Sequence, residues 1–266
     1  MTLAGKTAVI TGAAGGIGRA LAVSLARRGC HLALADIDET GLAETAALAS
    51  GPGLGVTCHR LDVADRRAVA DFPGAALAAH PGVDLLVNNA GVALGGDFEQ
   101  VAEADFEWLF DINFWGVVRM TRAFLPALKA SAEARIVNIS SLFGLIAPPG
   151  QTAYSASKFA VRGFSESLRH ELAGTRIGVT TVHPGGVATS IARNARMSVT
   201  VTDTERARME RRFQRLLTMP PERAAEIIVS GIERRRPRII VGRDAKLAAL
   251  LERLMPVGYW NLLRHR

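Results

Sequence analysis

Lys6-Thr-Ala-Val-Ile-Thr-Gly-Ala-Ala-Gly-Gly-Ile-Gly18 is the stretch that decides the fold. Its first half, Lys6–Thr11, is a short apolar and β-branched run that predicts a buried strand. Glycines follow at once, and helical periodicity then runs from Arg19 to Gly29. A strand, a glycine-rich turn and a helix in this order predict that the diphosphate of a dinucleotide binds at the N-terminus of the helix.

Each glycine of this turn has a separate expected use. Gly12 permits the tight turn, Gly15 and Gly16 let the backbone approach the diphosphate, and Gly18 lets the helix pack closely on the strand. Ile17 lies between the last two and belongs to the same candidate site. The alternative is an ordinary strand-to-helix turn that needs glycine only for its geometry.

Asp36 ends the second predicted strand, which starts at His31. An acidic side chain at this point accepts hydrogen bonds from the adenosine ribose of NAD and repels the additional phosphate of NADP. No Lys or Arg comes directly after it, since Ile37 and two acidic residues follow. Arg19 is the one nearby cation, and its position on the helix predicts an outward-facing side chain. The sequence therefore favours NAD over NADP, with Asp36 and Ile37 at the site.

Strands and helices alternate along the rest of the chain with short connections. The further helices are expected at 39–50, from Asp65, at 102–130 and at 152–173, and the further strands at 54–61, 83–87, 135–140, 177–182 and 239–242. This order predicts an α/β fold with a doubly wound, mainly parallel seven-stranded sheet and helices on both faces. We expect residues 1–266 to form a single domain of this Rossmann type.

Polar residues follow several of these strands at their carboxyl ends, where open α/β sheets bind ligands. Asp62 and Val63 follow the third strand and are placed to contact an adenine edge, although Asp62 is equally suited to be the N-cap of the next helix. Asn88-Asn-Ala-Gly91 follows the fourth strand, which makes Asn89, Ala90 and Gly91 cofactor candidates. Asn113 is an amide in an apolar helix, so it either braces the fold or holds a water molecule near the site.

Tyr154 and Lys158 are four residues apart and therefore share one face of a predicted helix. A nearby ammonium favours the phenolate, so Lys158 is expected to lower the pKa of Tyr154 toward neutral pH. Ser141, on the turn before this helix, is placed to hydrogen-bond the substrate oxygen. These three groups suit proton transfer on an alcohol or ketone.

Together these motifs make the sequence resemble the short-chain dehydrogenase/reductase family. The resemblance extends over about residues 5–190 and includes Pro184-Gly185-x-Val187-x-Thr189 after the sixth strand. It implies that Tyr154 is the general acid/base, that Lys158 also binds the nicotinamide ribose, and that Ser141 polarises the substrate oxygen. It further implies that Asn113 holds a water of a proton relay, and that Pro184, Gly185, Val187 and Thr189 cover the nicotinamide and its phosphates.

The amino-acid composition limits the class of protein to which the chain can belong. With 266 residues, 48% hydrophobic and 21% charged, the chain reads as a globular protein without low-complexity segments. Its two cysteines and six histidines are scattered, so we expect no metal site. Neither a signal peptide nor a membrane-spanning stretch is recognisable, and a cytoplasmic location is expected.

The substrate is expected to contact segments 92–98 and 142–150 and a lid at 190–218. The first two segments contain no Lys or Arg, which favours a hydrophobic secondary alcohol or ketone. Arg193 and Arg196 in the lid segment weaken that inference, because either could reach into the pocket. An NADP-linked carbonyl reductase of steroid, retinoid or acyl type, and a non-catalytic dinucleotide-binding protein, remain alternatives.

The C-terminal quarter carries the net charge of the chain. Residues 193–266 contain 17 Lys and Arg against 8 Asp and Glu. Within it, 244–266 is expected to form an amphipathic helix and an apolar tail. The tail is expected to pack on the core or on another subunit of a homo-dimer or homo-tetramer, with peripheral contact to an anionic membrane as the alternative. Nucleic-acid binding is disfavoured, because no aromatic platform accompanies the arginines.

Overall fold

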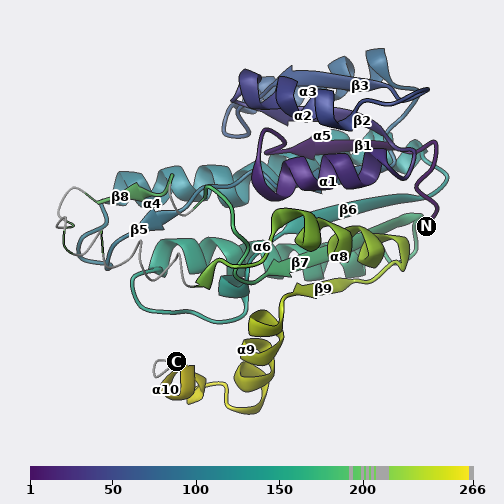
Figure 1. Cartoon of the computed structure of the whole chain (residues 1–266). Helices are drawn as coiled ribbons and strands as arrows, with labels where there is room; N and C mark the ends of the chain where they lie inside the picture. Colours follow the sequence, from purple (N-terminus) through teal and green to yellow (C-terminus); the bar gives the residue numbers. More distant parts are fainter. Residues whose placement is uncertain (192–193, 199–200, 202–203, 205–206, 208–215, 264–266) are drawn as a thin grey trace.

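A computed structural model of the chain gives its architecture (Figure 1) and describes residues 1–191, 194–198, 201, 204, 207 and 216–263. In this described part, no helix has both the length and the apolar character required to cross a membrane. The strands of the main sheet are β1 (Thr7–Thr11), β2 (His31–Asp36), β3 (Val56–Arg60), β4 (Leu85–Asn88), β6 (Ala134–Ile139), β7 (Ile177–Pro184) and β9 (Arg238–Val241).

All neighbouring strands of this sheet are parallel, in the order β3-β2-β1-β4-β6-β7-β9. The order reverses direction between β1 and β4, so the chain winds outward from the middle of the sheet in two halves. β1 and β4 are buried throughout, as their continuous apolar runs require. Their carboxyl ends lie side by side where the winding reverses, which is the usual ligand position in such sheets.

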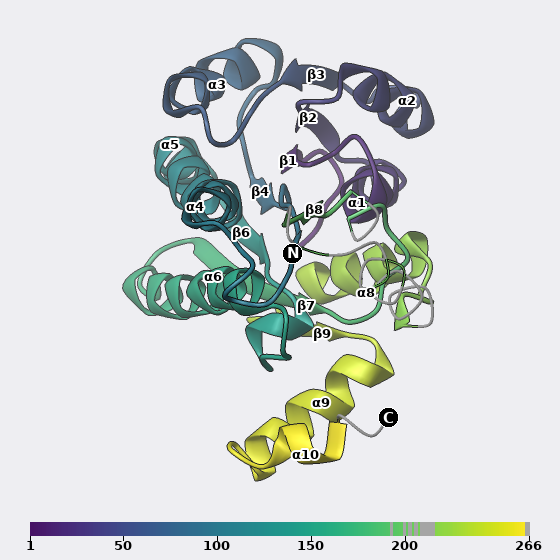
Figure 2. The same ribbon diagram turned by 90° about the vertical axis from the view of Figure 1, so that its left-hand side faces the viewer.

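Helices cover both faces of the sheet, as Figure 2 shows edge-on. One face carries α1 (Gly16–Ala26), α2 (Glu39–Ala49) and α8 (Pro221–Glu233), and the other carries α3 (Arg66–Ala79), α5 (Gly116–Ala130) and α6 (Thr152–Glu171). Each face has its own apolar core. The predicted doubly wound α/β fold with seven strands is therefore confirmed.

The long helix expected over 102–130 consists of three consecutive segments. These are α4 (Glu103–Phe110), the π-helical turn η1 (Asp111–Trp115) and α5. Asn113 lies in the π turn. Such turns widen the backbone locally and are frequent at functional sites, whereas apolar periodicity alone does not distinguish them from an α-helix.

Several short elements were not predicted. β5 (Leu94–Gly95) and β8 (Arg196–Met197) form a parallel two-stranded ribbon that joins one expected substrate segment to the expected lid. η2 (Leu142–Gly144) is a 3-10 turn directly after Ser141. Both ribbon strands have only two residues, which is too short for a period-2 pattern. Much of 190–218, including Arg193, lies outside the described residues, so the lid stays a prediction.

The C-terminal segment extends from the body as an arm made of α9 (Arg243–Leu254) and α10 (Tyr259–Leu263), at the bottom of Figures 1 and 2. The arm contacts the body at the 142–150 loop, where the backbone amide of Ala147 donates a hydrogen bond to the Tyr259 hydroxyl at 3.0 Å. This contact places the tail next to an expected substrate segment, but its apolar residues Leu254, Val257 and Leu262 stay exposed and do not pack on the core of the same chain. The alternative, packing on another subunit, stays a prediction.

Candidate functional site

Three of the four glycines between Gly12 and Gly18, where β1 turns into α1, cannot be replaced without strain or overlap. Gly12 and Gly16 have φ values of 64° and 52°, which strain any residue with a side chain. A Cβ at Gly18 would overlap the carbonyl of Gly12, so this glycine allows the close approach of helix and strand. A Cβ at Gly15 would meet nothing within 4 Å, so packing does not require glycine there. Ile17 is half-buried on the α1 face of the core.

Thr11 ties this turn to the loop after β4. Its hydroxyl accepts hydrogen bonds from the amides of Asn89 and Ala90, both at 3.1 Å. The Asn89 side chain donates in return to the carbonyls of Thr11 and Gly12. The Asn89 amide group is thus engaged with the backbone of the glycine turn, and its direct effect is to hold the two loops together. Thr11 lies in the glycine-rich stretch recognised from the sequence, but its hydrogen bonds depend on the loop at Asn89 and Ala90, which is distant in the sequence.

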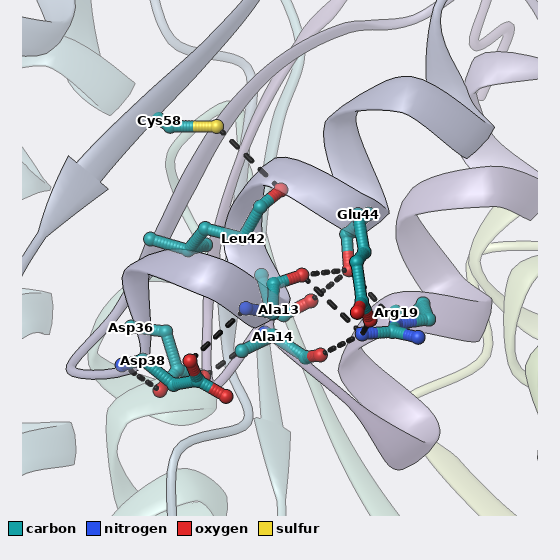
Figure 3. Close-up of polar contacts among 10 residues, drawn as sticks. Ala13, Ala14, Arg19, Asp36, Asp38, Leu42, Glu44 and Cys58 are labelled. Carbon is teal, nitrogen blue, oxygen red and sulfur yellow. Dashed lines mark hydrogen bonds and ion pairs between the residues drawn. The ribbon is translucent and has the colours of Figure 1, made fainter.

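Asp36 faces the glycine turn, as expected. Its carboxylate accepts hydrogen bonds from the amides of Ala14 at 3.0 Å and Asp38 at 3.1 Å (Figure 3). The two backbone donors fix the orientation of the carboxylate beside the turn. The neighbouring Ile37 is 64% exposed, so its side chain offers an apolar surface on the same edge.

The prediction for Arg19 was wrong in its direction. Its guanidinium turns toward α2, where it donates to the Ala14 carbonyl and to Thr45 Oγ1 and pairs with Glu44 at 2.7 Å (Figure 3). The helix position predicted an outward side chain, because the approach of α2 could not be foreseen from periodicity in α1. Arg19 is therefore near the Asp36 edge, but its charge is already paired with a carboxylate.

The alternatives for Asp62 are resolved by its neighbour. Asp65 is the N-cap of α3 and accepts from the amides of Arg67 and Ala68, while Asp62 accepts from Ala64 within its own turn. Asp62 is thus not the helix cap, and its exposed side chain remains a candidate for contact with an adenine edge. Val63 is buried with its side chain against Gly116, so only its backbone is turned toward the loops.

The segment after β7 closes over the glycine turn. A Cβ at Gly16 would lie 3.1 Å from the Thr189 side chain, so the two loops are in contact. Val187 is buried, and Gly185 follows Pro184 with its amide bonded to the Val241 carbonyl. Asp244, in the first turn of α9, accepts from the Gly186 amide at 2.7 Å. Sequence reasoning missed Asp244, because nothing local indicates that a residue so far along the chain supports this loop.

Lys158 lies at the junction of three elements. Its ammonium is buried, 3% exposed, and donates to the Ile139 carbonyl at 3.2 Å. A Cβ on Gly91 would lie 3.4 Å from the ammonium nitrogen and 3.1 Å from Asn113 Oδ1. The structure thus brings Lys158, Gly91 and Asn113 together. Burial lowers the pKa of Lys158 to about 8.

Asn113 braces the fold. Its fully buried side chain accepts from the Val92 amide and donates to the Val92 carbonyl and to Ser157 Oγ. These bonds pair both polar atoms of the side chain, so the first of its two expected roles is observed.

Tyr154 and Ser141 face each other near this ammonium. The Lys158 nitrogen is 5.6 Å from the centre of the Tyr154 ring, and Phe143 packs edge-on against the same ring. Burial raises the pKa of Tyr154, and a hydrogen bond with Ser141 opposes this effect. The expectation that Lys158 lowers the pKa of Tyr154 toward neutrality was therefore wrong for this structure. Removal of the phenol from water raises its pKa more than any nearby charge lowers it. The four-residue spacing of Tyr154 and Lys158 does not reveal this burial.

His183 is a further residue that sequence reasoning missed. It is fully buried at the end of β7, and its Nδ1 hydrogen-bonds the Ser141 carbonyl at 3.0 Å. Because Pro184 follows it directly, His183 connects the candidate substrate-oxygen donor to the loop that closes over the glycine turn. It directly precedes the Pro184–Thr189 motif, and its hydrogen-bond partner Ser141 belongs to a distant segment of the sequence.

Known proteins resemble this chain in both sequence and fold. The family model described as short chain dehydrogenase matches residues 6–199. SadH of Mycobacterium tuberculosis is 48% identical over 263 residues, which cover 97% of this chain and 94% of that protein.

Solved structures give the same result. A short-chain dehydrogenase/reductase from Burkholderia phymatum, solved in complex with NAD, has a TM-score of 0.88 and 34% identity over 95% of this chain and 94% of its own. An alcohol dehydrogenase from Thermococcus sibiricus, complexed with 5-hydroxy-NADP, has a TM-score of 0.75 and 26% identity over 89% of this chain and 95% of its own. The chain therefore belongs to the short-chain dehydrogenase/reductase family of oxidoreductases.

Proposed function

We propose that the protein is an NAD(H)-dependent oxidoreductase that interconverts a hydrophobic secondary alcohol and its ketone. The observation that carries the proposal is the buried ammonium of Lys158, held by Ile139 and next to Gly91, one helical turn from Tyr154. A buried cation beside a half-buried phenol is costly to maintain, and such pairs concentrate at sites of proton transfer.

The residues present suit a nicotinamide dinucleotide. The glycine turn leaves the backbone of Gly15 open beside the α1 N-terminus, and Asp36 offers an oriented carboxylate to a ribose diol. A bound NAD would supply the hydride acceptor or donor. The NAD complex of the Burkholderia phymatum relative supports this choice, and the Glu44 partner of Arg19 disfavours the phosphate of NADP.

In this proposal Tyr154 exchanges the proton. During ketone reduction its hydroxyl gives a proton to the substrate oxygen as the carbon gains hydride, and during alcohol oxidation the phenolate takes that proton back. Ser141 donates a hydrogen bond to the same oxygen and orients it. Lys158 stabilises the phenolate through its charge and would bind the nicotinamide ribose. These roles were expected from the sequence, and the observed proximity of the three side chains supports them.

The substrate class follows from the loops near Tyr154. Segments 92–98 and 142–150 contain no Lys or Arg, and Phe143 packs on the catalytic ring. Arg196 had weakened the inference, but its guanidinium pairs with Asp105 at 2.7 Å and stacks on Trp108 of α4. These contacts hold it on α4 and support an apolar substrate.

The substitution Tyr154→Phe tests the proposal. The variant should lose almost all turnover of a hydrophobic ketone panel with NADH, while NADH binding measured by fluorescence titration stays near the wild-type value. Phe159→Tyr, an exposed position on the same helix, is a matched control that keeps an aromatic ring and should retain activity. A Tyr154→Phe variant with most of its activity would refute the mechanism.

Three further expectations remain predictions. A homo-dimer or homo-tetramer and a peripheral membrane contact are both supported by exposed leucines on α9 (Leu247, Leu250 and Leu254). A cytoplasmic location is the third of these predictions. The alternatives of an NADP-linked reductase and of a non-catalytic dinucleotide-binding protein would gain support from a lower KM for NADP, or from tight NAD binding without any turnover.

A further inference from the structure

A basic hollow lies at the amino-terminal ends of the strands, opposite the candidate active site at their carboxyl ends. It has a volume of about 590 Å³ and lies where β6 and β7 begin and α6 ends. Ser141 follows β6 at its other end, six residues after Arg135, which corresponds to roughly 20 Å along a strand. The hollow is therefore separate from the residues proposed to bind the dinucleotide and the substrate.

The charge of the hollow is unbalanced. Its lining contains four arginines (Arg135, Arg169, Arg176 and Arg235) and one carboxylate, Glu133. Glu133 is already bonded to Arg235 at 2.6 Å. In the described part of the chain, no carboxylate pairs with Arg169, Arg176 or Arg135. Arg169 also lies in the last turn of α6, where the helix dipole favours a cation, but this does not account for the other two.

Arg135 is the unusual member of the set. Its side chain is 6% exposed, and one guanidinium nitrogen donates to Thr180 Oγ1 at 2.8 Å while its Nε has no hydrogen-bond partner. A Cβ at Gly178 would lie 2.5 Å from another guanidinium nitrogen, so the glycine provides the space in which Arg135 lies. A buried guanidinium normally has an anionic partner, because its desolvation is otherwise uncompensated.

We propose that the basic hollow binds a phosphate-bearing small molecule, with Arg135 at its base and Arg169 and Arg176 at its rim. Guanidinium groups bind phosphate oxygens through paired, charge-assisted hydrogen bonds. Three arginines without a carboxylate partner around one hollow suit a dianion better than a single carboxylate. The volume exceeds that of one phosphate, which leaves room for a diphosphate or an organic phosphate ester. Glu133 faces the same hollow, but Arg235 offsets its repulsion of an anion.

Isothermal titration with inorganic pyrophosphate tests the proposal on the full chain. The protein is saturated with NAD, so that the dinucleotide site does not take up the probe, and ionic strength is held constant. The wild type should show one saturable site. Arg176→Glu and Arg169→Glu, on exposed or half-exposed positions, should each weaken binding about tenfold or more, as expected for the loss of a charge-assisted bond and the added repulsion. Arg67→Glu, 94% exposed on α3, is the control and should bind like the wild type.

Two more variants address the base of the hollow. Arg135→Gln and Gly178→Ala should both weaken pyrophosphate binding while NAD binding stays intact, and the rim variants keep the test valid if either of these fails to fold. Equal affinity in Arg176→Glu and Arg67→Glu, or heat that never saturates, would overturn the proposal.

A parallel sedimentation with phosphatidic acid vesicles distinguishes the source of the phosphate. Sedimentation that Arg176→Glu abolishes identifies a lipid headgroup as the ligand. Pyrophosphate binding without such sedimentation identifies a soluble one. Assembly of the wild type into dimers whose formation excludes pyrophosphate would instead assign the hollow to a second copy and overturn the proposal.

Discussion

The carboxylate of Asp36 accepts a hydrogen bond from the backbone amide of Ala14 at 3.0 Å, which joins the end of β2 to the glycine turn after β1. The bond keeps the negative charge on the edge where an adenosine ribose would lie. Arg19, the nearest cation considered for a phosphate, contacts the carbonyl of the same Ala14 but is paired with Glu44. Of these two groups, only the Asp36 carboxylate therefore leaves its charge available to a ligand beside the glycine turn.

We predict that Asp36→Asn relaxes the preference for NAD. Loss of the charge removes the repulsion of a 2′-phosphate and weakens the bonds to the ribose diol, so the ratio of kcat/KM for NAD over NADP should fall about tenfold or more. Steady-state kinetics with both cofactors measure this ratio. Asp71→Asn, at an exposed position of α3, is the control and should leave it unchanged. A wild type with the lower KM for NADP would contradict the cofactor assignment.

The pH dependence of the two reaction directions should differ. Because burial raises the pKa of Tyr154 above its ordinary value of about 10, the phenol is protonated at neutral pH and ready to donate. Alcohol oxidation needs the phenolate, so its kcat/KM should rise about tenfold per pH unit between about pH 6 and 8. Ketone reduction should stay nearly constant between about pH 6 and 7, below the pKa of about 8 of Lys158. An oxidation rate independent of pH would contradict Tyr154 as the proton acceptor.

The features that could be predicted from the sequence are those set by residues close together in the chain. The alternation of strands and helices determined the sheet, and the place of Asp36 after a strand determined its position beside the glycine turn. The direction of the Arg19 side chain and the pairing of Asn113 with Val92 depend on how distant segments approach each other. The spacing of residues along the sequence does not predict such contacts. The raised pKa of Tyr154 likewise depends on burial by the assembled loops.

Gly91 is predicted to be required for the geometry around Lys158. In Gly91→Ala the new methyl group would lie 3.1 Å from Asn113 Oδ1 and 3.4 Å from the ammonium, so one of these groups must shift. A displacement of this kind should lower kcat/KM about tenfold or more. The matched control is Gly163→Ala in α6, where a Cβ meets nothing within 4 Å, and it should retain activity. Equal kinetics in the two variants would show that the site tolerates the methyl group.

His183 should make the protein less stable in acid. Burial lowers its pKa to about 4, against about 6.5 in the unfolded chain. The unfolded state therefore binds the proton first as pH falls, and the stabilisation present above about pH 6.5 is lost progressively toward pH 4. Between about pH 7.5 and 5 this group alone should cost about 2 kcal/mol of unfolding free energy.

Urea unfolding of His183→Asn at both pH values isolates this contribution. An Asn side chain can still donate to the Ser141 carbonyl but does not titrate, so the variant should lose less stability than the wild type over the same interval. His59 and His80, whose pKa values burial also lowers, remain in both proteins and cancel in the comparison. Identical pH dependence of the two proteins would contradict the assignment.

The contact between Tyr259 and Ala147 connects the C-terminal arm to the loop next to Tyr154. The Ala147 amide donates to the Tyr259 hydroxyl, and the loop that it holds carries most of the apolar residues expected around the substrate. The Tyr259 end of the arm is therefore placed to influence substrate binding, whereas Asp244 at the start of α9 supports the loop after β7.

We predict that Tyr259→Phe raises the KM for a hydrophobic ketone, because the loop loses one hydrogen bond that fixes its position. One such bond is worth about 1 kcal/mol, which corresponds to roughly a fivefold change. The KM for NADH and the value of kcat should stay close to wild type, since Lys158 and Asp36 lie on other elements. Asn261→Ala, on the same short helix and exposed, is the control and should leave all constants unchanged. A Tyr259→Phe effect on NADH rather than on the ketone would show that the arm acts on the cofactor side instead.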